Sequence, residues 1–176
     1  PSTDDTLKNI DPNVVLDFVV TGDTQVSNIM PEREKNLNSF SQDIRNSQIE
    51  LDAFIIAGDV TENGFPEEYA RIYDNINDFN VRNYILCTGN HDIRLREYEQ
   101  CKERILGFMN SLNAEENHKD ELWYSYEING YTFIVIASES AEFEEADTAI
   151  AFLKYSVLLL FTCLNTFKFV LFPFPN

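Results

Sequence analysis

The chain has 176 residues, of which 44% are hydrophobic and 24% charged, a composition that suits one folded domain and excludes a wholly disordered chain. Thirty acidic residues against thirteen basic ones give a formal net charge of -17. This charge would repel the phosphate backbone of duplex nucleic acid and an anionic membrane surface. A small anionic ligand is not excluded, because bound divalent cations invert the local potential around carboxylates.

The first part of the chain is predicted to alternate strands with helices. An apolar, β-branched run at residues 14–20 is typical of a buried strand, and it ends at Gly22 and Asp23. A helix is then expected to begin at Pro31, because proline suits the first turn of a helix. Its apolar residues recur at helical spacing: Leu37, Phe40 and Ile44.

The same pattern occurs twice more. A second apolar run covers residues 53–57, and a helix is expected to follow it from Pro66. A third run covers residues 84–87, with a helical pattern after it at Leu95, Tyr98, Ile105, Met109 and Leu112. Strands that alternate with helices predict an α/β fold, in which helices cover a parallel sheet.

A β-hairpin is predicted farther along the chain. Two aromatic and β-branched runs, at residues 123–128 and 131–136, are separated by Asn129 and Gly130. This pair is typical of a two-residue turn with positive φ at both positions. We expect the hairpin to begin a second, mixed sheet.

The composition changes near the C-terminal end of the sequence. Residues 150–176 contain no aspartate or glutamate, which predicts a domain at 1–149 followed by an atypical hydrophobic tail at 150–176. Lys154, Asn165 and Lys168 interrupt the apolar runs and weigh against a membrane-spanning segment. A buried pair of core strands is a second hypothesis. We favour a third, in which truncation, splicing or a shifted reading frame replaces the natural continuation of the domain.

Three polar segments follow the three predicted strands. They are residues 22–25 (GDTQ), 58–64 (GDVTENG) and 89–92 (GNHD). Open α/β sheets bind ligands at the carboxyl ends of their strands, so the segments are expected to share one crevice. Turn formation explains the glycine, asparagine and aspartate of each segment, but it does not explain why three such segments each follow a predicted strand. In order and spacing they resemble the first three motifs of the calcineurin-like metallophosphoesterases, over roughly residues 14–147.

The resemblance implies a metallophosphoesterase-like α/β/β/α sandwich of mixed sheets, truncated on its C-terminal side. It also implies a di-metal centre where a metal-activated hydroxide attacks a small phosphomonoester or phosphodiester substrate. Asp23, Gln25, Asp59 and Asn90 match the metal-ligand positions, with Asp59 bridging the two ions. Their oxygen donors suit hard cations such as Mn²⁺ and Mg²⁺, and the resemblance also allows Fe or Zn.

Two further residues match the catalytic positions of the family. His91 corresponds to the histidine that protonates the leaving alkoxide or stabilises charge on the phosphoryl oxygens. Glu62, three residues after Asp59, corresponds to an acid that partners this histidine in some members. A lone histidine in a loop is more often structural, so the catalytic role depends on its place in the motif.

The sequence departs from the family pattern in two places. Gln25 stands where the family usually has histidine, which replaces an imidazole nitrogen by an amide oxygen. No histidine follows residue 137, so the late histidine ligands of the family have no match. We therefore expect one metal ion or none here, and impaired hydrolysis. Two other functions stay open, a non-catalytic binding module with this fold and a membrane-tethered domain anchored by residues 150–176.

Overall fold

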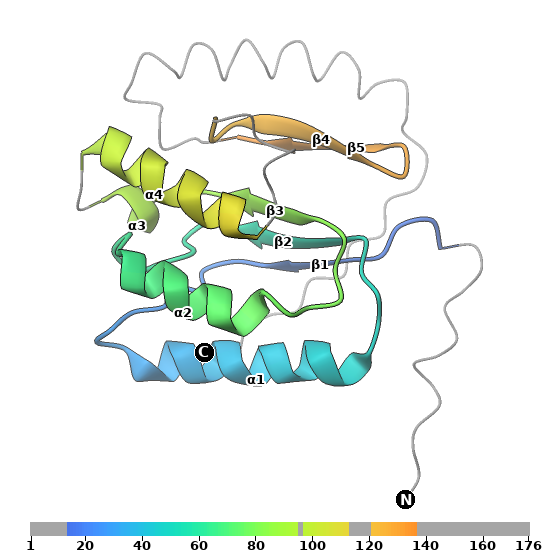
Figure 1. Cartoon of the computed structure of the whole chain (residues 1–176), viewed down its shortest axis with the longest axis horizontal. Helices are drawn as coiled ribbons and strands as arrows, with labels where there is room; N and C mark the ends of the chain where they lie inside the picture. Colours follow the sequence, from blue (N-terminus) through green and yellow to red (C-terminus); the bar gives the residue numbers. More distant parts are fainter. Residues whose placement is uncertain (1–13, 95–96, 113–120, 137–176) are drawn as a thin grey trace, which may run out of the picture.

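The computed structural model describes residues 14–94, 97–112 and 121–136. Strands and helices alternate through most of this part, and two strands follow the last helix (Figure 1). In chain order the elements are β1 (Phe18–Thr21), α1 (Pro31–Ser47), β2 (Ala53–Ala57), α2 (Pro66–Ile76), β3 (Tyr84–Cys87), α3 (Asn90–Ile93), α4 (Tyr98–Ser111), β4 (Tyr124–Ile128) and β5 (Tyr131–Val135).

The first three strands form a parallel sheet in the order β1-β2-β3. Phe18 of β1 pairs with Ala53 of β2, and Phe54 of β2 pairs with Tyr84 of β3. Because the strands run in the same direction, the polar segments that follow them emerge at the same edge of the sheet. The predicted α/β class and parallel sheet are confirmed.

The first strand is shorter than predicted. The run at residues 14–20 was expected to be a buried strand, but β1 begins at Phe18, and Val14 and Val15 are 44% and 59% exposed. The reason is the position of the partner strand. β2 begins at Ala53, opposite Phe18, so the preceding residues have no strand to pair with in the described part of the sheet.

Helices and the hairpin cover opposite faces of the parallel sheet (Figure 1). On the helical side, the ring of Phe54 lies 6.1 Å from that of Phe40 in α1 and 5.1 Å from that of Phe79, between centroids. On the other side, the ring of Phe18 meets that of Phe133 in β5 edge-on, 5.9 Å apart. Successive side chains of a strand point to opposite faces, so one sheet contributes to two apolar layers.

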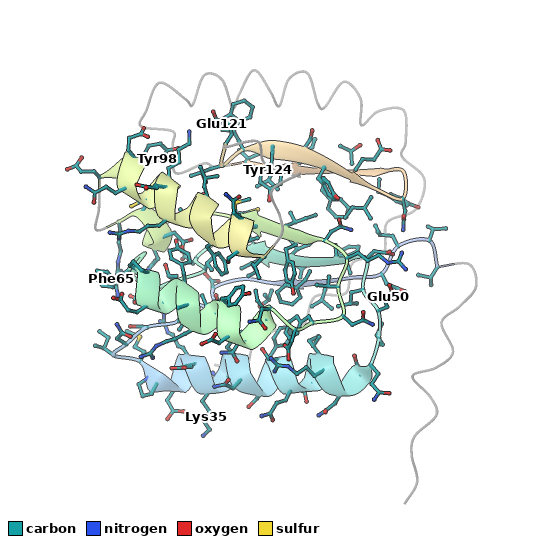
Figure 2. The ribbon with its side chains drawn as sticks, in the orientation of Figure 1. Lys35, Glu50, Phe65, Tyr98, Glu121 and Tyr124 are labelled. Carbon is teal, nitrogen blue, oxygen red and sulfur yellow. The ribbon has the colours of Figure 1, made fainter. Side chains whose placement is uncertain are left out.

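The hairpin is attached to β3 by a hydroxyl group. The Tyr124 hydroxyl donates to the carbonyl oxygen of Leu86 at 3.0 Å and accepts from its N–H at 2.9 Å. Figure 2 shows Tyr124 on the hairpin, and Lys35 on the side of α1 that points away from the sheet. Burial raises the pKa of Tyr124, which keeps its hydroxyl protonated and able to donate.

The hairpin itself follows the sequence prediction. β4 and β5 pair antiparallel, and Asn129 and Gly130 have φ values of 52° and 81°, as a type I′ turn requires. Within the described residues this second sheet is antiparallel, and its expected mixed pairing stays a prediction. The proposed boundary and the tail at 150–176 lie outside the described residues. In the described ranges, no helix has the length and apolar character that crossing a membrane requires.

Substitution of two glycines tests whether the turn requires a positive φ at residue 130. An added Cβ meets nothing within 4 Å at Gly130 or at Gly107 of α4, but only Gly130 has a positive φ. We expect Gly130→Ala to lower the free energy of unfolding by about 1 kcal/mol. Gly107→Ala is the matched control and should raise it by about 0.5–1 kcal/mol. Urea denaturation measures both, and equal effects would contradict the turn assignment.

Candidate active site

Backbone hydrogen bonds join the segments that follow β1 and β2. The N–H of Asp23 donates to the carbonyl oxygen of Gly58 at 3.1 Å, and that of Gln25 donates to the carbonyl oxygen of Asp59 at 2.9 Å. These bonds continue the parallel pairing beyond the ends of the strands. They place the first two motif segments side by side, as the sequence predicts.

Three predicted metal ligands have left-handed backbone conformations. The φ values of Asp23, Gln25 and Asp59 are 51°, 39° and 47°. For a residue with a Cβ this conformation costs about 1–3 kcal/mol, and it persists where the surrounding structure enforces it. Here the backbone bonds between the two segments enforce it. Strain of this kind gathers at functional sites.

The carboxylate of Asp59 connects all three motif segments. Its Oδ1 accepts the N–H of His91 at 3.0 Å, and its Oδ2 accepts the side-chain N–H of Gln25 at 3.1 Å. A Cβ at Gly89 would lie 2.0 Å from Asp59 Oδ1, so the third segment packs against this carboxylate only because residue 89 is glycine. Gln25, Asp59 and His91 are therefore brought together.

Asp23 and Asn90 lie at the exposed side of the same three segments. Both residues are exposed, whereas Gln25 and Asp59 are partly buried. Within the described residues, no hydrogen bond links the side chains of Asp23 or Asn90 to Asp59. Of the four predicted ligands, Gln25 and Asp59 are thus joined by a side-chain hydrogen bond, whereas Asp23 and Asn90 are exposed on the neighbouring segments.

Glu62 is surrounded by basic groups. Its side chain is 7% exposed, and it accepts Arg33 Nη1 at 2.6 Å and Arg94 Nη2 at 2.7 Å. The Nδ1 atom of His91 lies 3.4 Å from Glu62 Oε1 and 3.2 Å from its main-chain oxygen. Both neighbours are oxygen acceptors, so Nδ1 carries a ring proton. The predicted contact between Glu62 and His91 is present.

Arg33 is the site residue that the sequence analysis missed. It lies in the first turn of α1, beside Glu32 and Glu34. A cation is unfavourable there, because the helix dipole is positive at the N-terminus. A lone arginine among acidic residues in a first turn was therefore a usable signal for a partner elsewhere. A hollow of about 110 Å³ beside it is lined by Asp23, Thr24, Arg33, Asn36 and Leu37.

Asp92 ties the second and third segments together. Its side chain is nearly inaccessible, at 1% exposure. The carboxylate accepts the N–H groups of Val60, Thr61 and Gly89 at 3.1, 2.8 and 2.9 Å, and the Thr61 hydroxyl at 2.8 Å. Burial raises the pKa of Asp92, and these donors oppose the rise. Asp92 therefore holds the backbone of the second and third segments in place.

The donor set matches a hard divalent cation better than a soft one. Asp23 and Asp59 offer carboxylate oxygens, and Gln25 and Asn90 offer amide oxygens, which suit Mn²⁺ or Mg²⁺. In residues 14–94, 97–112 and 121–136, no three His, Cys, Asp or Glu side chains gather into a metal-binding group. Among the described residues, a metal at this site would therefore depend on mixed carboxylate and amide donors.

Comparison with known families decides the relationship. The model of the calcineurin-like phosphoesterases matches residues 16–153, which include all three motif segments. The chain belongs to the calcineurin-like phosphoesterase family. A search of curated proteins finds no individual match. Membership confirms the family prediction and supports a phosphoesterase type of function, and calcineurin-like phosphoesterases typically use divalent metals.

The buried carboxylate of Asp92 gives a stability test of this calcineurin-like phosphoesterase site. Asp92→Ala leaves several buried N–H groups without an acceptor, so we expect it to lower the free energy of unfolding by about 3 kcal/mol or more. Asp78→Ala is the control, because Asp78 forms an exposed ion pair with Arg45 and should cost less than about 1 kcal/mol. Chemical denaturation of both variants measures the difference. Similar losses would contradict the role given to Asp92.

Proposed function

We propose that the chain is a metal-dependent phosphoesterase that acts on small phosphomonoesters or phosphodiesters. The observation that carries this proposal is the position of Asp59, whose two carboxylate oxygens contact Gln25 and His91 from different motif segments. The Asp59 carboxylate accepts the side-chain amide of a candidate ligand and the main-chain N–H of His91, so it gathers the three motif segments as metal-assisted hydrolysis would need. The net charge of -17 favours a small substrate over duplex nucleic acid.

Asp23, Gln25, Asp59 and Asn90 would hold the metal, with Mn²⁺ or Mg²⁺ favoured by their oxygen donors and Fe or Zn as alternatives. A divalent ion bound there would supply Lewis acidity toward a phosphoryl oxygen. Asp23 and Asn90 are exposed, so this side of the cluster is accessible to a substrate. The left-handed backbone at Asp23, Gln25 and Asp59 sets the direction of their Cα–Cβ bonds, and a hydrogen bond joins the Gln25 and Asp59 side chains before any ligand arrives.

His91 is the proposed general acid, and Glu62 is the residue that positions it. The Nδ1–H group of His91 points to Glu62. In the imidazolium form the ring carries a second proton on Nε2, which it would transfer to the leaving alkoxide. Arg33 and Arg94 hold the two oxygens of Glu62 in place. This second layer of contacts keeps the imidazole ring oriented.

We expect the turnover of the 176-residue chain to be weak, because no histidine follows residue 137 and the family pattern uses late histidines as metal ligands. A second candidate function is a non-catalytic binding module with one weak cation site. The lack of a three-residue acidic, histidine or cysteine group among the described residues favours it. Tethering to a membrane rests on residues 150–176, which lie outside the described part of the chain.

Activity assays separate the two candidate functions. With Mn²⁺ present, the chain should hydrolyse p-nitrophenyl phosphate or bis-p-nitrophenyl phosphate slowly. Asp59→Asn should lower kcat/KM at least tenfold, because it removes a charge from the centre of the cluster. Asp74→Asn is the control, since Asp74 is exposed on α2, away from the motif segments. Turnover that survives Asp59→Asn would rule out this site.

The leaving group tests the role of His91. A general acid matters most for a poor leaving group, which needs protonation as the bond breaks. His91→Asn should therefore reduce kcat for phenyl phosphate roughly tenfold more than kcat for p-nitrophenyl phosphate. Glu62→Gln should produce the same pattern more weakly. An equal reduction for both substrates would show that His91 does not donate the proton.

A further inference from the structure

Arg33 makes an unusual set of contacts in the candidate site. Its Nη1 atom donates to the side-chain oxygen of Gln25, to the main-chain oxygen of Gln25 at 3.4 Å and to Glu62 Oε2 at 2.6 Å. The Arg33 side chain is 34% exposed. A guanidinium group is therefore hydrogen-bonded to the oxygen atom that the first motif offers to a metal.

The amide orientation of Gln25 is fixed by its second partner. Its Nε2 donates to Asp59 Oδ2 at 3.1 Å, and a flipped amide would place its oxygen against that carboxylate. The same flip would turn the NH₂ group toward the guanidinium of Arg33, so that donor faces donor. The amide oxygen of Gln25 therefore faces the cation.

Arg33 is held in this place by more than its contact with Gln25. It lies in the first turn of α1, where the helix dipole disfavours a positive charge. The partly buried ion pair with Glu62 offsets that cost. Since Glu62 also binds Arg94 at 2.7 Å, Arg33 is the second cation on one carboxylate and is not needed to neutralise it.

We propose that Arg33 is a resident cation that competes with a divalent metal ion for the side-chain oxygen of Gln25. This inference rests on the proposed function, in which Gln25 is a metal ligand. A divalent ion lies about 2.0–2.6 Å from a carbonyl oxygen that binds it. A guanidinium on the same oxygen would then lie within about 5 Å of the ion, where like charges repel strongly.

Metal binding at Gln25 therefore requires Arg33 to leave that oxygen. The bond to Glu62 gives Arg33 an alternative partner, so it can release Gln25 while it stays in the site. The chain is expected to bind metal at this position more weakly than it would without Arg33. Gln25 stands where the family usually has histidine, and its amide oxygen accepts a hydrogen bond from Arg33. The two residues would then lower the metal affinity of this position together.

Titration calorimetry with Mn²⁺ tests the competition on the whole 176-residue chain. Arg33→Met should bind Mn²⁺ at least fivefold more tightly than the unmodified chain. Arg71→Met is the matched control, because Arg71 forms a partly exposed ion pair with Glu34 on the neighbouring helix at 2.8 Å. The Mn²⁺ affinity of this variant should equal that of the unmodified chain. Arg33→Gln removes the charge and keeps a polar side chain, so it should show the same gain if the methionine variant does not fold.

The Gln25→Ala variant tests whether Arg33 acts through the side-chain oxygen of Gln25. In Gln25→Ala, the further change Arg33→Met should give no gain in Mn²⁺ affinity. A gain that persists there would show a general charge effect and overturn the competition for Gln25. Equal affinities of the unmodified chain and the Arg33 variants would overturn the inference alone. If none of these proteins binds Mn²⁺, the metal site of the proposed function fails, and the inference fails with it.

Discussion

The arrangement of the candidate site depends on one carboxylate, that of Asp59. It follows β2, the central strand of the parallel sheet, and it contacts groups from the segments after β1 and β3. Three loops that start from separate strands are thereby fixed around one charge. Because β2 has a strand on each side, its end is the position from which a single residue can reach both neighbouring loops.

Two aspartates at the carboxyl ends of the parallel strands have different surroundings. Asp92 is buried, and its carboxylate accepts several hydrogen bonds from the backbone and from Thr61, which leaves it little capacity for a ligand. Asp23 is exposed and carries a carboxylate that faces solvent. Asp92 maintains the shape of the loops, and Asp23 is the one proposed to bind a cation.

Most of the described fold was predictable because it depends on local patterns. Apolar runs followed by glycine and aspartate indicated the parallel strands, and Asn129 with Gly130 indicated the hairpin. The start of β1 was not predictable, since it depends on where Ala53 begins the partner strand. The contact between Glu62 and His91 was expected from motif spacing. Arg33 reaches the site from α1, outside every motif. Its place in an acidic first turn indicated a partner elsewhere, but only the three-dimensional path of the chain shows that the partners are Gln25 and Glu62. The roles of the metal ligands stay predictions.

The left-handed backbone at Gln25 also bears on which residues this position of the loop can accept. Histidine, like asparagine and aspartate, is several-fold enriched among non-glycine residues with positive φ. The φ of 39° at Gln25 is therefore a conformation that an imidazole side chain can share with an amide one. The loop can exchange an amide for an imidazole at this position without a new backbone path, so the backbone alone does not decide which donor atom stands there.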